Sequence, residues 1–186
     1  NYGKRKGCNT INRPKYLCTD RALLSDAIQH AATHCFKIYK KIDNFVILLC
    51  NSVCFSADDI KKGLEIINKN KRTETVTTVS KFNMFSPVRA KKIVKKEIKN
   101  YIPNSIISRF TDLSGDRDLS TDTYFCTHSF TISKAKVLVN MNKNNYPFKW
   151  MGKKIKYIKQ DFCIGDVDFE WQLPVLKWWL QKNKRT

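Results

Sequence analysis

The chain has 186 residues, of which 42% are hydrophobic, so it is long enough for one domain with a substantial core. Its longest apolar runs fall far short of the roughly 18 residues of a membrane span, and no membrane association is predicted. Seven cysteines without a C-x-x-C pair predict free thiols in a reducing cytoplasm, and they argue against a disulfide framework or a zinc site.

The positive charge of the chain raises the question of a polyanionic partner. Lys and Arg number 35 against 16 Asp and Glu, which gives a net charge of +19. The lysines are spread through nearly every segment, and the chain is also rich in Asn and Ile, so A/T-rich codon usage explains the charge as well as function does. The sequence has no helix-turn-helix, RNA-binding aromatic pair or zinc finger, so a nucleic-acid-binding module is the alternative interpretation here.

The first half of the chain alternates strand and helix patterns. Residues 44–50 (NFVILLC) form a continuous apolar run, typical of a central strand covered on both faces. Ser56 and Asp59 resemble a capping box at the start of a helix. This alternation predicts an α/β fold with parallel strands and right-handed crossovers. The elements expected in this half are strands at 9–12, 44–50 and 73–80 and helices at 22–40 and 56–68.

The second half contains an excursion that the pattern leaves undecided. Residues 91–98 fit either two short strands or a helix, and residues 112–122 are a polar loop. We therefore expect one domain over residues 1–186, with an excursion at residues 90–122. The elements expected after it are strands at 124–132, 154–160 and 164–170 and helices at 133–140 and 173–182.

An alternating acidic segment lies near the end of the chain. In a strand, residues i, i+2 and i+4 point to one face, so Asp166, Asp168 and Glu170 are expected side by side. Mg²⁺ takes one or two protein carboxylates and completes its shell with water and phosphate oxygens, so Asp166 and Asp168 are the candidate magnesium ligands. An edge strand with a solvated acidic face is the alternative.

The ends of the predicted strands supply the other candidate residues. In parallel sheets, ligands bind beyond the carboxyl ends of the strands. Residues 51–56 and 81–89 follow two such strands and are the expected pocket walls.

The motifs, taken in order, resemble those of the acylneuraminate cytidylyltransferase family, which activates sialic-acid-like (nonulosonic) sugar acids with CTP. Arg13–Leu17 (RPKYL) with Ser25–Ile28 (SDAI) is similar to the opening segment that the chain retains. Val46–Ile60 and Ser86–Ala90 (SPVRA) are similar to the next two stretches. Pro147–Lys154 and Gly165–Gln172 match the closing motifs of one branch.

The resemblance implies a three-layer α/β/α nucleotide-diphosphosugar-transferase-like domain with a mostly parallel sheet that lacks its first strands. It implies that the sugar hydroxyl attacks the α-phosphate of CTP, with Mg²⁺ held by Asp166 and Asp168. Arg13 and Ser25 resemble CTP contacts, and Arg89 resembles a basic group for the sugar-acid carboxylate. The family's excursion at 90–122 is a dimerisation lobe, so a homodimer is expected.

Three departures from the family bear on activity. The Gly-rich loop that wraps the triphosphate has no counterpart, so we expect an incomplete chain that starts after it. Cys50 replaces a Gln that reads cytosine, which moves base recognition to Asn51 with its neighbour Ser52. Thr127-His128-Ser129 replaces an Asn-Gly or Asp-Gly pair near the sugar. A copy that keeps the fold without turnover is the alternative.

Overall fold

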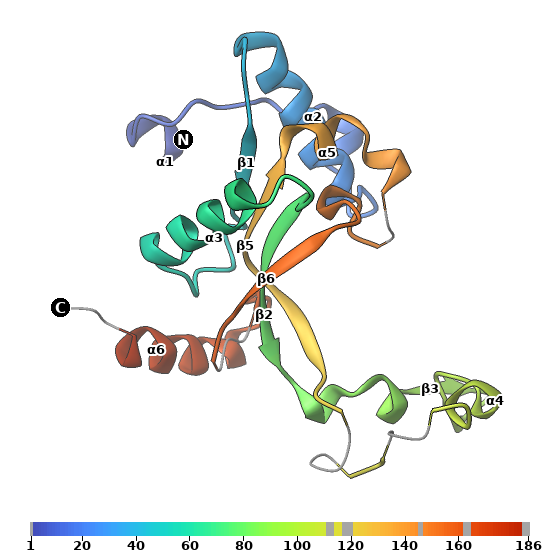
Figure 1. The fold of residues 1–186 in the computed structure, drawn as a ribbon. Helices are drawn as coiled ribbons and strands as arrows, with labels where there is room; N and C mark the ends of the chain where they lie inside the picture. Colours follow the sequence, from blue (N-terminus) through green and yellow to red (C-terminus); the bar gives the residue numbers. More distant parts are fainter. Residues whose placement is uncertain (1, 111–113, 117–120, 145–146, 162–164, 184–186) are drawn as a thin grey trace.

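The protein folds around a four-stranded sheet in which one strand runs against the other three. The computed structural model describes residues 2–110, 114–116, 121–144, 147–161 and 165–183. The sheet order is β1-β5-β2-β6 (Figure 1). The strands are β1 (Asn44–Ile47), β2 (Thr75–Lys81), β5 (Tyr124–Lys134) and β6 (Ile155–Lys159). Because β5 pairs antiparallel with both β1 and β2, while β2 pairs parallel with β6, the strands β1, β2 and β6 share one direction.

Helices cover both faces of this sheet, which confirms the α/β fold class. Figure 1 shows α3 (Ala57–Lys69) on one side and α2 (Leu24–Ile38) with α5 (Ala135–Val139) on the other. Under α3 the core contains Ile67, Val76, Phe130 and Ile132. Under α2 and α5 it contains Ala32, Leu138, Met141, Trp150 and Met151. The capping box at the start of α3 is confirmed, because Ser56 Oγ accepts from Asp59 N and the Asp59 carboxylate accepts from Ser56 N.

Buried hydroxyl groups fix the register between β2 and β5. Thr75 Oγ1 lies 3.0 Å from Ser133 Oγ, and Thr77 Oγ1 lies 3.1 Å from Thr131 Oγ1. All four side chains are buried, so a slip of one residue would leave these hydroxyls without partners in the core. The β-branched run that predicted the β2 strand therefore also sets its pairing.

The pairing is interrupted by a bulge at His128. The register shifts between Thr77 and Val79, and His128 has a positive φ of 51°. Thr78 Oγ1 accepts hydrogen bonds from Thr127 Oγ1 at 2.7 Å and from Ser129 N at 3.1 Å, which anchors the bulge on both sides. A bulge re-aims the side chains around it, and this one lies in β5 just before Thr131, the first β5 residue that pairs with β1.

Two strand predictions in the first half need correction. Residues 9–12 are not a strand but an extended approach to the 3-10 helix η1 (Lys15–Leu17). The run at 44–50 forms a shorter strand, and β1 lies at the edge of the described sheet rather than at its centre. Val46 is accordingly 39% exposed and Leu48 49% exposed. Apolar composition alone does not distinguish a central strand from such an edge strand.

The excursion is a small lobe built on a hairpin, which resolves the ambiguity at 91–98. β3 (Lys91–Val94) pairs antiparallel with β4 (Glu97–Asn100). The two linking residues, Lys95 and Lys96, both have positive φ, as a two-residue turn of type I′ requires. The short helix α4 (Asn104–Ile107) follows, and Figure 1 shows the hairpin and α4 projecting from one end of the sheet.

The remaining helices are short, apart from the last. α1 (Tyr2–Arg5) lies at the start, and α6 (Leu173–Lys182) closes the described chain. Among the described residues, no helix has the length and apolarity that crossing a membrane needs. The six described cysteines have free thiols, as the sequence predicted, and Cys163 lies outside the described residues.

Gly63 is expected to be irreplaceable in α3, although Ala is the better helix former. A Cβ at this position would lie 2.7 Å from Ile132 Cδ1 and 3.2 Å from Phe130 Cε2. Overpacking of this kind costs about 1–3 kcal/mol and outweighs the ~1 kcal/mol gained in helix propensity. We expect Gly63→Ala to lower the free energy of unfolding in a urea titration, whereas Gly115→Ala, with open space around it, should leave that energy nearly unchanged.

Candidate active site

The acidic segment is held in an irregular conformation by Gln172, and the prediction of a strand there was wrong. Residues 165–168 have no regular structure, and Glu170–Gln172 form the 3-10 helix η6. Gln172 Oε1 accepts hydrogen bonds from Asp168 N at 2.7 Å and from Phe169 N at 2.8 Å, and Gln172 Nε2 donates to Asp166 O at 3.2 Å. These local bonds take backbone groups that a neighbouring strand would otherwise have used.

The segment contacts the turn that follows β1. Val167 N donates to Asn51 O at 2.9 Å, and Asn51 Nδ2 donates to Asp168 Oδ1 at 3.0 Å. The turn after β1 therefore lies beside Asp166 and Asp168, which come from a segment near the other end of the chain. Four of the predicted site residues, Asn51, Ser52, Asp166 and Asp168, lie together at this carboxyl edge, the edge toward which β1, β2 and β6 run.

The bulged strand β5 forms the inner wall of this arrangement. Ser52 is fully buried, and its Oγ donates to Thr127 O at 3.4 Å. A Cβ on Gly165 would lie 3.4 Å from the same carbonyl oxygen, and Gly165 has a φ of +74°. That positive φ favours glycine, because a side chain in this conformation is strained, whereas the space beside Thr127 O would admit a Cβ. The bulge and this glycine thus place Asp166 next to Ser52.

Asp166 is the more buried of the two aspartates. Burial raises its pKa, the nearby Asp168 raises it further, and His128 and the Ser52 hydroxyl oppose the increase. Asp166 Oδ1 is inaccessible to solvent and has no hydrogen-bond partner among the described residues. Neither Asp166 nor Asp168 takes part in the ion pairs between described residues, so no lysine neutralises the pair.

His128 is a neighbour of the acidic pair that the family motif does not supply. Its ring lies 4.5 Å from the Phe148 ring and 6.0 Å from the Trp150 ring, measured between centroids. Burial lowers its pKa, and the Asp166 carboxylate opposes that change. Both ring nitrogens are buried without a hydrogen-bond partner among the described residues. The sequence signal for this neighbour was the replacement of a glycine-containing pair by Thr127-His128-Ser129.

The other predicted residues contribute from different elements. Arg13 Nη1 donates to Leu17 O at 3.4 Å, and Ser25 is 7% exposed in the first turn of α2. Arg89 ends the 3-10 helix η3 (Pro87–Arg89), where its Nη1 contacts Met84 Sδ at 3.9 Å. Among the described contacts, no hydrogen bond or ion pair joins these three side chains to Asp166 or Asp168.

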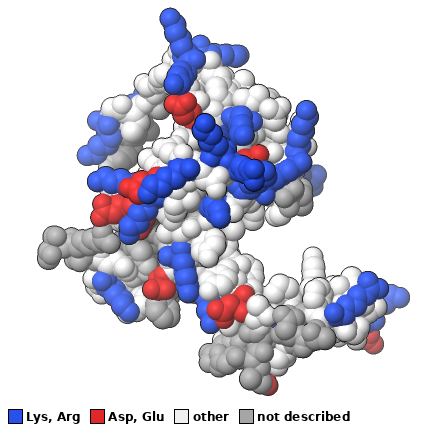
Figure 2. All heavy atoms as spheres, viewed as in Figure 1, with Lys and Arg blue, Asp and Glu red and all other residues white. Residues whose placement is uncertain are grey.

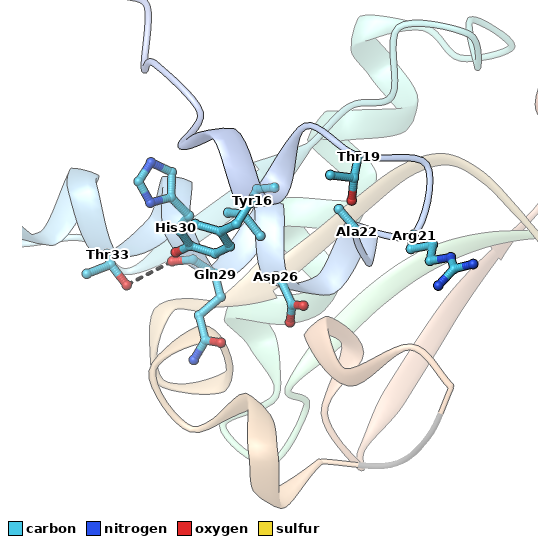
Figure 3. A pocket seen from close by; sticks show the side chains of 9 residues that line it. Tyr16, Thr19, Arg21, Ala22, Asp26, Gln29, His30 and Thr33 are labelled. Atoms are coloured by element: carbon cyan, nitrogen blue, oxygen red, sulfur yellow. Dashed lines mark hydrogen bonds between the residues drawn. The ribbon is translucent and has the colours of Figure 1, made fainter.

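A polar cavity of about 530 Å³ lies between η1 and α2 (Figure 3). Figure 3 shows Asp26 and Gln29 pointing from α2 to the same side, while Arg21 extends away from them. Thr33 Oγ1 donates to Gln29 O within the helix at 2.8 Å. Of the predicted CTP contacts, Ser25 belongs to α2 and Arg13 precedes η1, and neither is among the residues that line the cavity. The lining is Tyr16, Leu17, Thr19, Arg21, Ala22, Asp26, Gln29, His30 and Thr33.

A metal ion at the carboxyl edge would have two protein carboxylates to bind. Within the described part of the chain, no group of three or more His, Cys, Asp or Glu side chains is arranged to hold a metal. Sites that saturate an ion with protein ligands, such as structural zinc, are therefore not found there. Two carboxylates suit a hard cation that keeps water and substrate oxygens in its shell.

Comparison with known proteins gives one kind of match. No protein-family model matches the chain, and no curated protein matches it. Among solved structures, it is similar to the CMP:2-keto-3-deoxy-manno-octonic acid synthetase complexed with CTP, with a TM-score of 0.52 and 9% sequence identity. The match covers 88% of this chain and 70% of the synthetase chain. At this identity, the likeness shows that the two proteins share a fold.

The burial of Asp166 should reduce stability at neutral pH. The pKa of Asp166 is higher in the folded state than in the unfolded state. The free energy of unfolding therefore decreases as the pH rises above the ordinary Asp value, and it increases again as the pH falls. We expect Asp166→Asn to raise the free energy of unfolding at pH 7, because the parent must bury a charged carboxylate there. Urea titrations of both proteins should converge near pH 4, and a variant less stable than the parent at pH 7 would contradict this account.

Proposed function

We propose that this protein has the chemistry of a cytidylyltransferase, joining the CMP group of CTP to a nonulosonic, sialic-acid-like sugar acid and releasing pyrophosphate. The observation that carries the proposal is the meeting of Asn51 and Ser52 with Asp166 and Asp168 at the carboxyl edge of the sheet. That edge is where ligands bind in open α/β sheets. The shared fold with a synthetase whose structure contains CTP, together with the motif order, supports the same reaction class.

The residues at this edge fit Mg²⁺. Asp166 Oδ1 is buried and finds no hydrogen-bond partner in the described part of the chain, so a donor or a cation would satisfy it. Asp168 is exposed, and Asn51 fixes one of its oxygens. We therefore assign the metal to Asp166 and Asp168. When bound, Mg²⁺ supplies neutralisation of phosphate charge and polarisation of bound oxygens.

The chain's own residues would act mainly by positioning. In the proposed reaction, a sugar hydroxyl attacks the α-phosphorus of CTP, the bond to the β-phosphate oxygen breaks, and pyrophosphate leaves. Asn51 holds Asp168 in place, and Gln172 and Gly165 hold the backbone that carries both aspartates. Orientation and fixed charges provide most of the rate enhancement in such transfers.

The remaining predicted residues would bind the ends of the substrates. We place CTP contacts at Arg13, whose Nη1 donates to Leu17 O, and at Ser25 in the first turn of α2. We place the sugar-acid carboxylate at Arg89, whose guanidinium makes one weak contact, to the Met84 sulfur, among the described residues. Arg is suited to that role because its planar fork matches a carboxylate. A base contact from Asn51 completes the proposed substrate site.

Asp168→Asn should reduce metal-dependent activity while the protein remains folded. The parent is expected to release pyrophosphate from CTP in the presence of Mg²⁺ and a suitable nonulosonic acid. Loss of a ligand that holds the ion should reduce kcat/KM by about 100-fold or more. Glu170→Gln is the matched control, because this exposed acid lies two residues further on in the same segment and should retain activity.

The assay should be run on this chain and on a version with any upstream coding sequence of the gene restored. Binding of CTP with Mg²⁺, followed as a shift of the melting temperature, provides a readout that does not need turnover. If neither version releases pyrophosphate with any of the acids tested, the enzymatic proposal is wrong. A protein that shows the melting shift without turnover would be a CTP-binding copy of the fold.

We also propose that the chain forms a homodimer through the lobe at residues 90–122. Ile93 and Ile98 are paired across the hairpin, and they are 80% and 74% exposed. An apolar cavity of about 540 Å³ lies where the lobe joins the sheet, lined mainly by Met84, Phe85, Pro87, Arg89, Tyr101 and Phe125. Large apolar side chains gathered in this way mark interaction surfaces.

Ile93→Ser combined with Ile98→Ser should turn the dimer into a monomer. Both side chains are exposed in the single chain, so the substitutions remove interface area without emptying a core. Light scattering should show half the mass of the parent. The melting temperature of the variant should show that each chain still folds. The double variant Trp178→Ser, Trp179→Ser tests the other candidate surface, on α6. If this variant alone is a monomer, the dimer interface is on α6 and not on the lobe.

A further inference from the structure

The edge of the sheet opposite the candidate active site carries a dense group of basic side chains. β2 and β6 begin here, at Thr75 and Ile155, and β5 ends here at Lys134. Figure 2 shows lysines and arginines gathered over this part of the molecule, where Figure 1 places α5 and the starts of β2 and β6. We call it the basic edge, and it consists of Lys71, Arg72, Lys134, Lys136, Lys153 and Lys154.

Backbone and side-chain contacts around Glu74 hold these cations together. Glu74 Oε2 accepts from Lys153 N at 2.7 Å and from Lys154 N at 3.1 Å. Lys134 N donates to Glu74 O, and Lys134 Nζ donates to Lys71 O at 2.8 Å. The basic edge is thus assembled from three segments distant in sequence, which explains why the even spread of lysines along the chain concealed it.

The charge at the basic edge exceeds what its one central carboxylate can balance. The Lys153 N–H, with smaller effects from the Lys154 N–H and the Lys136 and Lys154 ammonium groups, holds the pKa of Glu74 below its usual value. Burial and the nearby Lys136 charge lower the pKa of Lys134. None of the six basic side chains takes part in the ion pairs between described residues. Asp43, the next carboxylate along this edge, is paired with Lys41 at 3.9 Å.

We propose that the basic edge binds the phosphate backbone of nucleic acid, without reading its sequence. Closely spaced cations match the regular negative charge of a nucleic acid, and their contacts release condensed counterions. A membrane surface fits less well, because binding in the interface needs an apolar helix face. The helix at this edge, α5, has Ala135, Val137 and Leu138 buried in the core. The proposal is independent of the cytidylyltransferase activity.

The structure gives no basis for sequence-specific readout at this edge. The six basic residues lie in turns, at strand ends and in the five-residue helix α5, and none of these elements is long enough to enter a major groove as a recognition helix does. Contacts to phosphates position a protein but carry no sequence information. We therefore expect micromolar binding to RNA and DNA of mixed sequence, with a steep dependence on salt.

The test compares two variants with the same net charge. One is Lys136→Gln, Lys153→Gln, Lys154→Gln at the basic edge, where all three side chains are exposed. The other is Lys62→Gln, Lys92→Gln, Lys177→Gln, whose exposed lysines lie on α3, β3 and α6. Lys136→Arg, Lys153→Arg, Lys154→Arg retains the charge at the basic edge. Melting temperatures establish that each variant folds.

Fluorescence anisotropy measures the binding of a mixed-sequence single-stranded RNA, the DNA of the same sequence and a duplex DNA across a salt series. The basic-edge Gln variant should bind single strands about 10-fold or more weakly near 0.1 M salt, with a log–log salt slope lower by about 2 if three phosphate contacts are lost. The dispersed Gln variant and the Arg variant should stay close to the parent.

Three results would overturn the proposal. Equal losses in the two Gln variants would mean that total charge, rather than this edge, attracts the polyanion. No binding by the parent near 0.1 M salt would mean that the basic edge has no affinity for nucleic acid. Binding to vesicles rich in phosphatidylserine in the absence of any binding to nucleic acid would identify a membrane surface as the partner.

Discussion

The pairing of β2 with β5 is the constraint on which both the fold and the candidate site depend. Hydroxyl pairs such as Thr75 with Ser133 set its register, and Thr78 anchors the bulge by which the register shifts. The bulge places the Thr127 carbonyl oxygen where Ser52 donates to it, next to the backbone of Gly165. A change in this pairing would therefore displace the acidic segment as well as the core.

Much of the fold could be predicted from local patterns. The capping box at Ser56 and the β-branched run of β2 are local signals, and the structure confirms both elements. The position of a strand within the sheet is different, because it depends on which strands pair. The run at 44–50 has the composition of a central strand, yet β1 lies at the edge of the described sheet. The sequences of β1 and β2 likewise do not indicate that β5 pairs antiparallel between them.

The sequence predicted a grouping of four polar residues that the structure also shows, but it did not predict the conformation of the acidic segment. The D-x-D spacing and the polar turn after β1 identified Asp166, Asp168, Asn51 and Ser52 as candidates, and the structure brings these four together. Period-two spacing predicted a strand, whereas Gln172 satisfies the backbone of residues 166–169 from within the segment. The Gln172 side chain replaces the backbone hydrogen bonds that a neighbouring strand would make, and this depends on the rotamer of one residue. The hydrophobic pattern of the sequence contains no information about that rotamer.

Asn51 and Asp168 are 117 positions apart in sequence, and the hydrogen bond between them closes a very long loop. Closing so long a loop has an entropic cost that local contacts do not repay until the rest of the sheet has formed. We therefore expect the site to be completed late in folding, after the β2–β5 core has formed. A ligand that contacts both Asn51 and Asp168 would stabilise the contact between the carboxy-terminal segment and the turn after β1. Ligand binding should therefore also protect the carboxy-terminal segment from proteases.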